Sequence, residues 1–432
     1  MWFIQRNFAG TVEASCKNEQ GQGMSQGIRF NKLLGGTLLV TGTCIGAGML
    51  GLPVATAAGG FVPSLGVFIL VWALMIFTGL VMLEVSLYFD HDVNLISMAR
   101  ATMGNWGAKL AWITLVLFLY SLLAAYTASG SALVHAGFAS MGAPVSLSWV
   151  MLGFATVFAA VVYLGAHFVD YCNRLLIIGL LAAYFTLIFS VFPHVQATLL
   201  HDGEAKYLFA ASPLIVTAFG FHLLIPSLKT YLQNHVATLR WAIILGSTLP
   251  LLVYILWQVS ITGVIPTHGP EGLNAMYLEG EPVVPMIHAL DTLLGSSVIS
   301  DGAKLFVFFA IVSSYMGVAL GLFDFFADAL KIKKQAWKRI FLLGLTFLPP
   351  LVFALYYPEG FIMALGYAGF FAVILLILYP AFMAFRGRQK SLAKHYQVAG
   401  GSIALGAAML AGLFVILMEV LNRMQLLPLP HP

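Results

Sequence analysis

The sequence predicts an all-α polytopic membrane protein with eleven transmembrane helices. Of its 432 residues, 60% are hydrophobic and 9% are charged, whereas a typical soluble domain carries about 25% charged residues. Apolar runs long enough to cross a hydrocarbon core about 30 Å thick recur along the chain. The first and the sixth of these runs are interrupted by glycine and proline, which is typical of a site inside the membrane.

The eleven runs are joined by short connections. They cover residues 33–54, 63–88, 107–137, 146–166, 173–193, 209–231, 241–264, 303–330, 339–357, 361–385 and 398–424. The longest connection, about 266–302, follows the seventh run. It is long enough for a short helix that caps the site, although a surface loop without a gating role fits equally well.

The positions of lysine and arginine predict the orientation. Basic residues accumulate on the cytoplasmic side of membrane proteins. If the N-terminus is cytoplasmic, Lys206, Lys304 and Arg423 are the only ones of the 21 basic residues that lie outside. The C-terminus is then extracytoplasmic. The net charge of +4 follows from this topology, so we expect the lipid bilayer as a partner and no nucleic acid.

Three glycines mark the first run as a broken helix. Gly42, Gly46 and Gly48 fall within seven positions, and each glycine costs a helix interior about 1 kcal/mol relative to alanine. A break inside the bilayer leaves backbone N–H and C=O groups that need a partner, which is commonly an ion or a substrate. Close helix packing by small residues is the alternative.

A matching break is expected in the sixth run, where Gly220 is followed by Pro226. The two runs occupy equivalent positions if the chain consists of two halves of five helices with opposite orientation. We therefore expect a disordered cytoplasmic tail over 1–28, a first repeat over 29–193, a second over 205–385 and an accessory eleventh helix over 396–426.

Several strings carry a family resemblance. GTCIGAGMLGLP, FGFH, LRWAIILGS, SYMGVALGLFDFFAD, LTFLPP and FIMALGYAGF closely resemble the hydroxy and aromatic amino acid permeases, in particular their tyrosine and tryptophan branch. The resemblance runs from about residue 31 to the end. It implies a leucine-transporter-type five-plus-five inverted repeat with discontinuous helices 1 and 6. It also implies a bacterial-type inner membrane and uptake of an aromatic amino acid, with tyrosine favoured over tryptophan and phenylalanine, coupled to protons.

The two breaks together suit an amino acid zwitterion. Free amides at the start of the second half-helix, over Thr43, Gly46, Ala47 and Gly48, would bind the carboxylate. Free carbonyls near Thr41 and Gly42, and over Ala218, Phe219 and Gly220, would accept from the ammonium. Phe219 and Phe221 flank the second break and could stack on an aromatic substrate, or they could simply pack.

The coupling ion is H⁺ or Na⁺, and no other cofactor is expected. His222 is a candidate proton carrier, because histidine titrates near neutral pH, or a neutral hydrogen-bonding residue. The resemblance places Ser313 and Ser314 at a small-cation site, whose oxygen ligands would suit sodium. Serine pairs also bond back to their own helix. Glu84 is either a gate or proton carrier or an interfacial carboxylate.

Other classes of function find less support in the sequence. An intramembrane enzyme would need a nucleophile or metal-binding motif such as GxSxG or HExxH at mid-depth in the membrane, and neither appears there. A channel would need a continuous polar lining, whereas the polar residues gather at two breaks. We therefore expect no enzyme. A sodium-coupled carrier of another neutral amino acid stays an alternative, and the oligomeric state is open.

Overall fold

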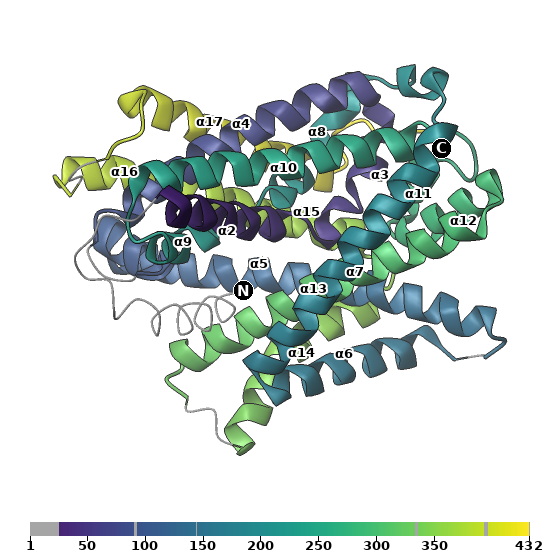
Figure 1. Cartoon of the computed structure of the whole chain (residues 1–432), viewed down its shortest axis with the longest axis horizontal. Helices are drawn as coiled ribbons and strands as arrows, with labels where there is room; N and C mark the ends of the chain where they lie inside the picture. The colour runs from purple at the N-terminus through teal and green to yellow at the C-terminus, as the bar shows by residue number, and fades with distance from the viewer. Residues whose placement is uncertain (1–25, 90–92, 144, 333–335, 393–395, 432) are drawn as a thin grey trace.

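The computed structural model describes residues 26–89, 93–143, 145–332, 336–392 and 396–431, and these residues form helices and no strand. Ten helices are long and apolar enough to cross a membrane, and a pair bent by 51°, Asn31–Cys44 with Ala47–Gly59, makes an eleventh span. The predicted number of spans is thus confirmed. The spans run along the horizontal of Figure 1. Most of the tail expected over 1–28 lies outside the described residues.

The first five spans comprise eight helical segments. They are α2 (Gln26–Cys44), η1 (Ala47–Met49), α3 (Leu52–Thr56), η2 (Ala57–Gly59), α4 (Phe61–Ser86), α5 (Leu95–Ser140), α6 (Leu147–Leu164) and α7 (Ala166–Val191). The third span was expected to begin at residue 107. α5 begins earlier, at Leu95, but it consists of two helices that meet at a kink at Gly104, and the part after the kink agrees with the expected start. Asn94 caps the start at Leu95 by accepting from the Ser97 amide, and Gly104 bends the helix with a φ of +80°.

The second five spans repeat this order. They are formed by α8 (Leu208–Ala218), η6 (His222–Leu224) and α9 (Ile225–Tyr231), then α10 (Val236–Thr262), α13 (Ser297–Ala329), α14 (Ala336–Tyr356), and last α15 (Phe361–Ala372), the π-helix η7 (Val373–Leu378) and α16 (Tyr379–Gln389). The eleventh span is α17 (Gly401–Arg423). Short 3₁₀ turns, η3 (Phe192–His194), η4 (Ala197–His201) and η5 (Ala205–Tyr207), connect the two halves.

The packing pattern has the symmetry of an inverted repeat. The fifth span packs on the eighth (α7 on α13), and correspondingly the tenth packs on the third (α15 on α5). Likewise the first span packs on the seventh (α2 on α10), and the second packs on the sixth (α4 on α8 and α9). Each contact therefore recurs when the two halves are exchanged, as expected for two five-helix repeats.

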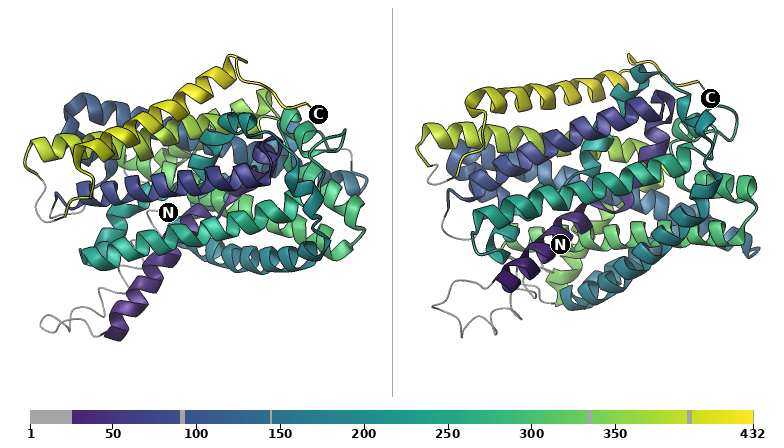
Figure 2. Two further views of the ribbon diagram at one scale, coloured as in Figure 1. Left: turned by 90° about the horizontal axis from the view of Figure 1, so that it is seen from above. Right: turned by 45° about the horizontal axis from the view of Figure 1, so that its top comes forward.

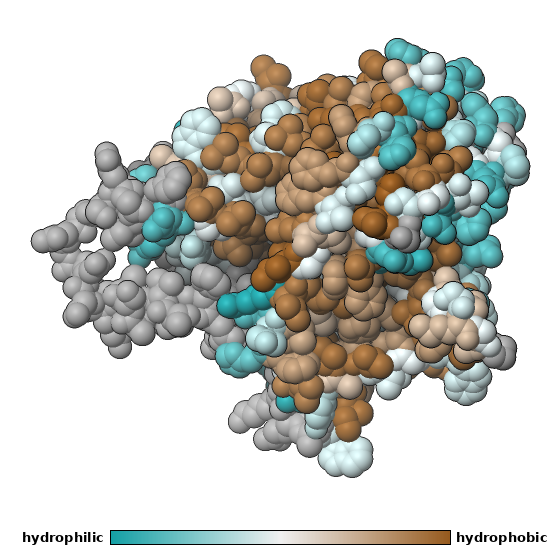
Figure 3. Space-filling view, turned by 45° about the vertical axis from the view of Figure 1, so that its right-hand side comes forward, coloured by the Kyte–Doolittle hydropathy of each residue, from teal (hydrophilic) through white to brown (hydrophobic). Residues whose placement is uncertain are grey.

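The two ends of the bundle differ in charge. We call one end the basic face, because Lys32, Arg240, Arg339 and Arg388 lie at the ends of α2, α10, α14 and α16 there. The chain begins its first span on this side and ends, after eleven spans, on the opposite face (Figure 1). Between the two faces the surface is a broad apolar belt (Figure 3), which suits contact with lipid.

The opposite face carries two loop helices, α11 (Leu273–Glu279) and α12 (Val283–Leu294), within the long connection after α10. The last described residues pack beneath them. The Asn274 side-chain amide donates to the His431 carbonyl at 2.8 Å. Pro428 and Pro430 border a small cavity together with Val54 and Tyr277. The loop and the C-terminal segment thus cover the second half of the broken first span.

Candidate substrate site

The first break lies two residues later than expected. We expected the helix to end near Gly42, but α2 continues to Cys44 because the Ile45 amide still bonds to the Thr41 carbonyl at 3.0 Å. Gly46 is extended, with φ −168° and ψ −163°. The Ala47 amide then donates to Ser314 Oγ of α13 at 3.0 Å. Within the described residues, no hydrogen bond is made by the amides of Gly46 and Gly48, so both are available to an anion.

The two threonines before the break use their side chains for packing. Thr41 Oγ1 donates to the Gly246 carbonyl of α10 at 3.0 Å. Thr43 Oγ1 bonds back to the Leu39 carbonyl at 2.7 Å and supports the last turn of α2. The Thr41 carbonyl already accepts from the Ile45 amide, so among the described residues only the Thr43 carbonyl of this pair is left for a substrate. Gly42 lies between them and faces open space.

The second break separates two phenylalanines that point to different neighbours. α8 ends at Ala218 and η6 begins at His222. Phe219 is fully buried and packs edge-on against Tyr254 of α10, with 5.1 Å between ring centroids. Phe221 instead stacks on the His222 ring at 4.7 Å and lies against Gly79 of α4. Phe219 is thus the better placed of the two to contact a substrate.

Tyr254 joins the two breaks. Its hydroxyl oxygen lies 2.7 Å from the carbonyl oxygen of Cys44 and 2.7 Å from that of Ala218, the last residues of α2 and α8. A phenol has one proton, so it cannot fully satisfy two carbonyls. Two negative helix ends converge there, which makes the spot favourable for a cation such as an ammonium group. Nothing in the uniformly apolar run around Tyr254 identified it in the sequence.

Replacing Tyr254 with phenylalanine should weaken substrate binding. The Tyr254 hydroxyl holds the ends of α2 and α8 together, and its loss leaves two buried carbonyls without their donor, at a cost of about 1–3 kcal/mol to this arrangement. The arrangement that binds the substrate is then less populated, so we expect a roughly 10- to 100-fold loss of apparent affinity in an equilibrium binding assay. Tyr184→Phe is the matched control, because the Tyr184 hydroxyl also donates to a backbone carbonyl, that of Val253 at 3.0 Å, on another helix pair. Equal affinity losses in both variants would refute the role of Tyr254.

His222 is fully buried and tied to α4. Its Nε2 lies 2.9 Å from Thr78 Oγ1, and that hydroxyl also lies 3.1 Å from the Leu74 carbonyl. Because the hydroxyl has one proton, donation to Leu74 favours an Nε2–H histidine that donates to Thr78. Nδ1 is then a buried acceptor, and it has no hydrogen-bond partner.

The adjacent serines of α13 play different parts. Ser314 Oγ accepts from the Ala47 amide, as described above, and is partly exposed. Ser313 Oγ bonds back to the Ala310 carbonyl at 3.3 Å. The structure therefore places Ser314 directly at the first break. The Ser313 hydroxyl instead donates within its own helix.

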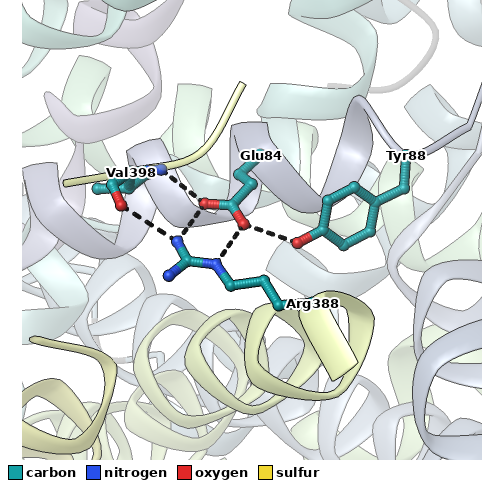
Figure 4. Close-up of polar contacts among 4 residues, drawn as sticks. All are labelled: Glu84, Tyr88, Arg388 and Val398. Carbon is teal, nitrogen blue, oxygen red and sulfur yellow. Dashed lines mark hydrogen bonds and ion pairs between the residues drawn. The ribbon is translucent and has the colours of Figure 1, made fainter. Parts of the chain in front are cut away.

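Glu84 lies outside this cluster, in a buried ion pair (Figure 4). Its carboxylate accepts from Arg388 Nε and Nη2 of α16 at 2.8 and 2.6 Å, and from the Tyr88 hydroxyl at 2.7 Å. The Val398 amide, in the linker to α17, adds a fourth bond at 2.7 Å. This bidentate geometry ties α4 to α16 and α17, and it leaves Glu84 fully buried.

Small residues of α13 lie between the first break and the basic face. Ser314, Gly317 and Gly321 follow one another along one face of α13 (spacing three and four residues), and the two glycines border open space, as Gly42 does. On this side α2 diverges from the bundle (Figure 2, left). The opposite side is covered by α11, α12 and the C-terminal segment. Small residues therefore lie between the breaks and the basic face, and covering segments lie on the other side.

A comparison with solved structures defines the fold. The chain superposes on the crystal structure of an Eremococcus coleocola manganese transporter with a TM-score of 0.61 and 13% identity, over 94% of this chain and 88% of that one. At that identity the likeness concerns the fold alone, which is the leucine-transporter type expected from the sequence. The sequence relatives reported next are named as transport proteins and not as enzymes, and they supply the class of protein.

The sequence comparisons supply the family. The profile of the tryptophan/tyrosine permease family matches residues 29–419, and the chain belongs to that family. It is 36% identical to the tyrosine-specific transport system 1 of Haemophilus influenzae, over 92% of this chain and 99% of the relative. It is 32% identical to the tryptophan-specific transport protein of the same organism, over 90% and 95%. The resemblance seen in the sequence is confirmed.

Proposed function

We propose that the protein is a secondary active transporter that imports an aromatic amino acid, tyrosine in the first place, by alternating access. The observation that carries this proposal is the convergence of both half-helix ends on Tyr254, beside the unbonded amides of Gly46 and Gly48. The carbonyls would accept hydrogen bonds from the ammonium group of an amino acid zwitterion, and the amides would donate to its carboxylate. In this view the basic face is cytoplasmic, with the N-terminus inside and the C-terminus outside.

The aromatic ring of the substrate is assigned to the Phe219 side of the site. Phe219 packs against Tyr254, so a ring bound next to the ammonium position would meet an aromatic surface. Such contacts contribute about 0.5–1.5 kcal/mol beyond area burial. Tyrosine and tryptophan are the substrates in the names of the relatives, and both carry an aromatic ring that could contact Phe219.

Proton symport is the form of coupling that we propose, with His222 as the carrier. Its Nδ1 is buried without a partner, so a proton could bind there while Nε2 keeps its bond to Thr78. Glu84 is unsuited to this task, because Arg388 neutralises it and its oxygens are already bonded. Sodium coupling at Ser314 is the alternative, supported by the position of that hydroxyl at the first break.

The variant His222→Gln should retain exchange and lose concentrative uptake. Glutamine can still bond to Thr78, but it has no nitrogen that titrates near neutral pH. In proteoliposomes we expect near-normal tyrosine exchange at equal pH on both sides. An imposed pH gradient should then produce at least tenfold less accumulation than in the wild type. Accumulation at the wild-type level would show that His222 does not carry the coupled proton.

The function is tested by uptake of labelled tyrosine, tryptophan and phenylalanine with pH and sodium gradients imposed separately. The proposal expects accumulation of aromatic substrates when the outside is acidic, in the absence of sodium. Accumulation only with sodium would favour the site at Ser314. A preference for a small neutral amino acid would refute the aromatic assignment.

A further inference from the structure

The corner between α11 and α12 is docked on the membrane helices. Gly280 ends α11 in the left-handed region, with φ +86°, and its carbonyl accepts from the Ile362 amide at the start of α15 at 3.0 Å. A Cβ on Gly280 would collide with the Glu359 carbonyl oxygen. We call α11, α12 and this corner, residues 273–294, the lid. The backbone of the lid thus fits closely against the loop that precedes α15.

The next residue, Glu281, places a carboxyl group inside this contact. It is 9% exposed and accepts from Ser129 Oγ of α5 at 2.9 Å and from the amides of Val283 and Val284 at 3.3 Å each. The same carboxylate therefore caps α12 and holds it to α5. No lysine or arginine of the described residues pairs with it in a salt bridge. A buried carboxylate without a cation is costly unless it is protonated.

The surroundings of Glu281 favour the protonated form. Burial is the main cause that raises the pKa of Glu281, to about 7, and the negative charge of Glu359 adds to it, whereas the bonds from Ser129 and the two amides lower it. The other titratable groups on the helices around Glu281 are exposed, have another partner or lie further along their helix. Glu279, His288 and Asp291 of the lid are exposed, Tyr277 bonds to Asn422 of α17, and His135 lies further along α5.

We infer that Glu281 is a proton-binding residue whose protonation from the opposite face closes the lid over the site. A docked lid removes the carboxyl group from water, and an undocked lid returns it to water. Protons must therefore bind more tightly to the docked lid and stabilise it. The inference rests on the proposed alternating-access function, because a lid has a purpose only if the opposite face opens during transport.

The direction of the pH effect follows from the two pKa values. The carboxyl group titrates near its ordinary value of 4.5 when the lid is open and at about 7 when it is docked. The proton's contribution to docking is complete below pH 4.5, is lost progressively between 4.5 and 7, and is absent above 7. Over that range the ratio of docked to open lid should fall by the order of a hundredfold.

The lid contact reaches the first break through α5 and α13. Ser129 lies two residues from Thr127, whose hydroxyl donates to that of Tyr315 at 3.3 Å. Tyr315 adjoins Ser314, the acceptor for the Ala47 amide. Protonation at the lid thus acts on helices that also hold the first break.

A distance measurement between the lid and α5 tests this inference. Spin labels at Leu293 of α12 and Met141, the residue after α5, occupy exposed positions, and attachment through noncanonical amino acids avoids the native cysteines. In lipid nanodiscs, without substrate, we expect a short distance at pH 4.5 and a growing population of longer distances up to pH 7.5. The variant Glu281→Gln should keep the short distance throughout.

Two further variants should shift the midpoint in opposite directions. Ser129→Ala removes a bond that lowers the pKa, so its midpoint should rise. Glu359→Gln removes a negative charge that raises the pKa, so its midpoint should fall. The inference would be overturned if the distance between the labels in the wild type did not change with pH, or if Glu281→Gln showed the same change with pH as the wild type. Since no substrate is present, that failure would leave the proposed transport function untouched, and failed tyrosine uptake would leave the lid result standing.

Discussion

The variant Gly46→Leu is expected to lose tyrosine uptake completely while remaining in the membrane. A Cβ at this position would overlap the Ser314 hydroxyl, which holds the Ala47 amide. Any side chain must therefore push α13 away from the first break or displace the amides that we assign to the carboxylate. Overpacking of this kind costs about 1–3 kcal/mol even for a small group, so Gly46→Ala should already lower uptake roughly 10- to 100-fold.

Gly66→Leu is the matched control for this prediction. Gly66 lies on α4 and is exposed, and a Cβ at this position would have no neighbouring atom within 4 Å. The same leucine there should leave uptake and expression near wild type. Uptake is compared per amount of purified, folded transporter in proteoliposomes. Near-normal uptake by Gly46→Leu would contradict the assignment of the first break to the substrate.

The second large effect is expected on stability, from Arg388→Met. This change leaves the Glu84 carboxylate buried without its cation, and removal of one partner from a buried ion pair typically costs about 3–5 kcal/mol. The midpoint of thermal unfolding in detergent should fall by several degrees. The double variant Glu84→Gln with Arg388→Met should recover most of the loss, because glutamine is neutral and still accepts from the Tyr88 hydroxyl or the Val398 amide.

An exposed ion pair serves as the comparison for Arg388. Lys304 and Asp301 of α13 lie 3.4 Å apart, with side chains 54% and 70% exposed, and such pairs contribute little. Lys304→Met should therefore leave the unfolding midpoint almost unchanged. If Arg388→Met were equally mild, or if the double variant were no more stable than the single one, the network around Glu84 would not be the anchor described above.

Much of the fold could be predicted because it depends on local properties of the chain. The eleven runs, the break at Gly46 and the break near Gly220 follow from hydropathy and from the helix-weakening effect of glycine. The end of α2 was placed two residues too early, since the Thr43 hydroxyl and the Ile45 amide keep the helix intact beyond Gly42. The short helix that precedes the kink at Gly104 was missed because residues 95–103 lack the continuous apolar pattern of a span.

The residues that sequence reasoning missed depend on contacts between distant parts of the chain. Tyr254 lies in an ordinary apolar run, and its role appears only when α10 is placed beside both breaks. Arg388 is 304 residues from Glu84, so nothing in the sequence links the two. Glu281 was one of several acidic residues in a long loop. Its burial against Ser129 distinguishes it from the exposed Glu279 two positions earlier.

Counterflow of labelled tyrosine distinguishes alternating access from other routes across the membrane. Proteoliposomes containing the protein are loaded with unlabelled tyrosine and diluted into labelled tyrosine, without any ion gradient. A carrier that alternates access around the two breaks predicts transient accumulation of label above the external concentration. Loading with an unrelated charged amino acid should give none. Label that only equilibrates, at a rate independent of internal tyrosine, would contradict the account.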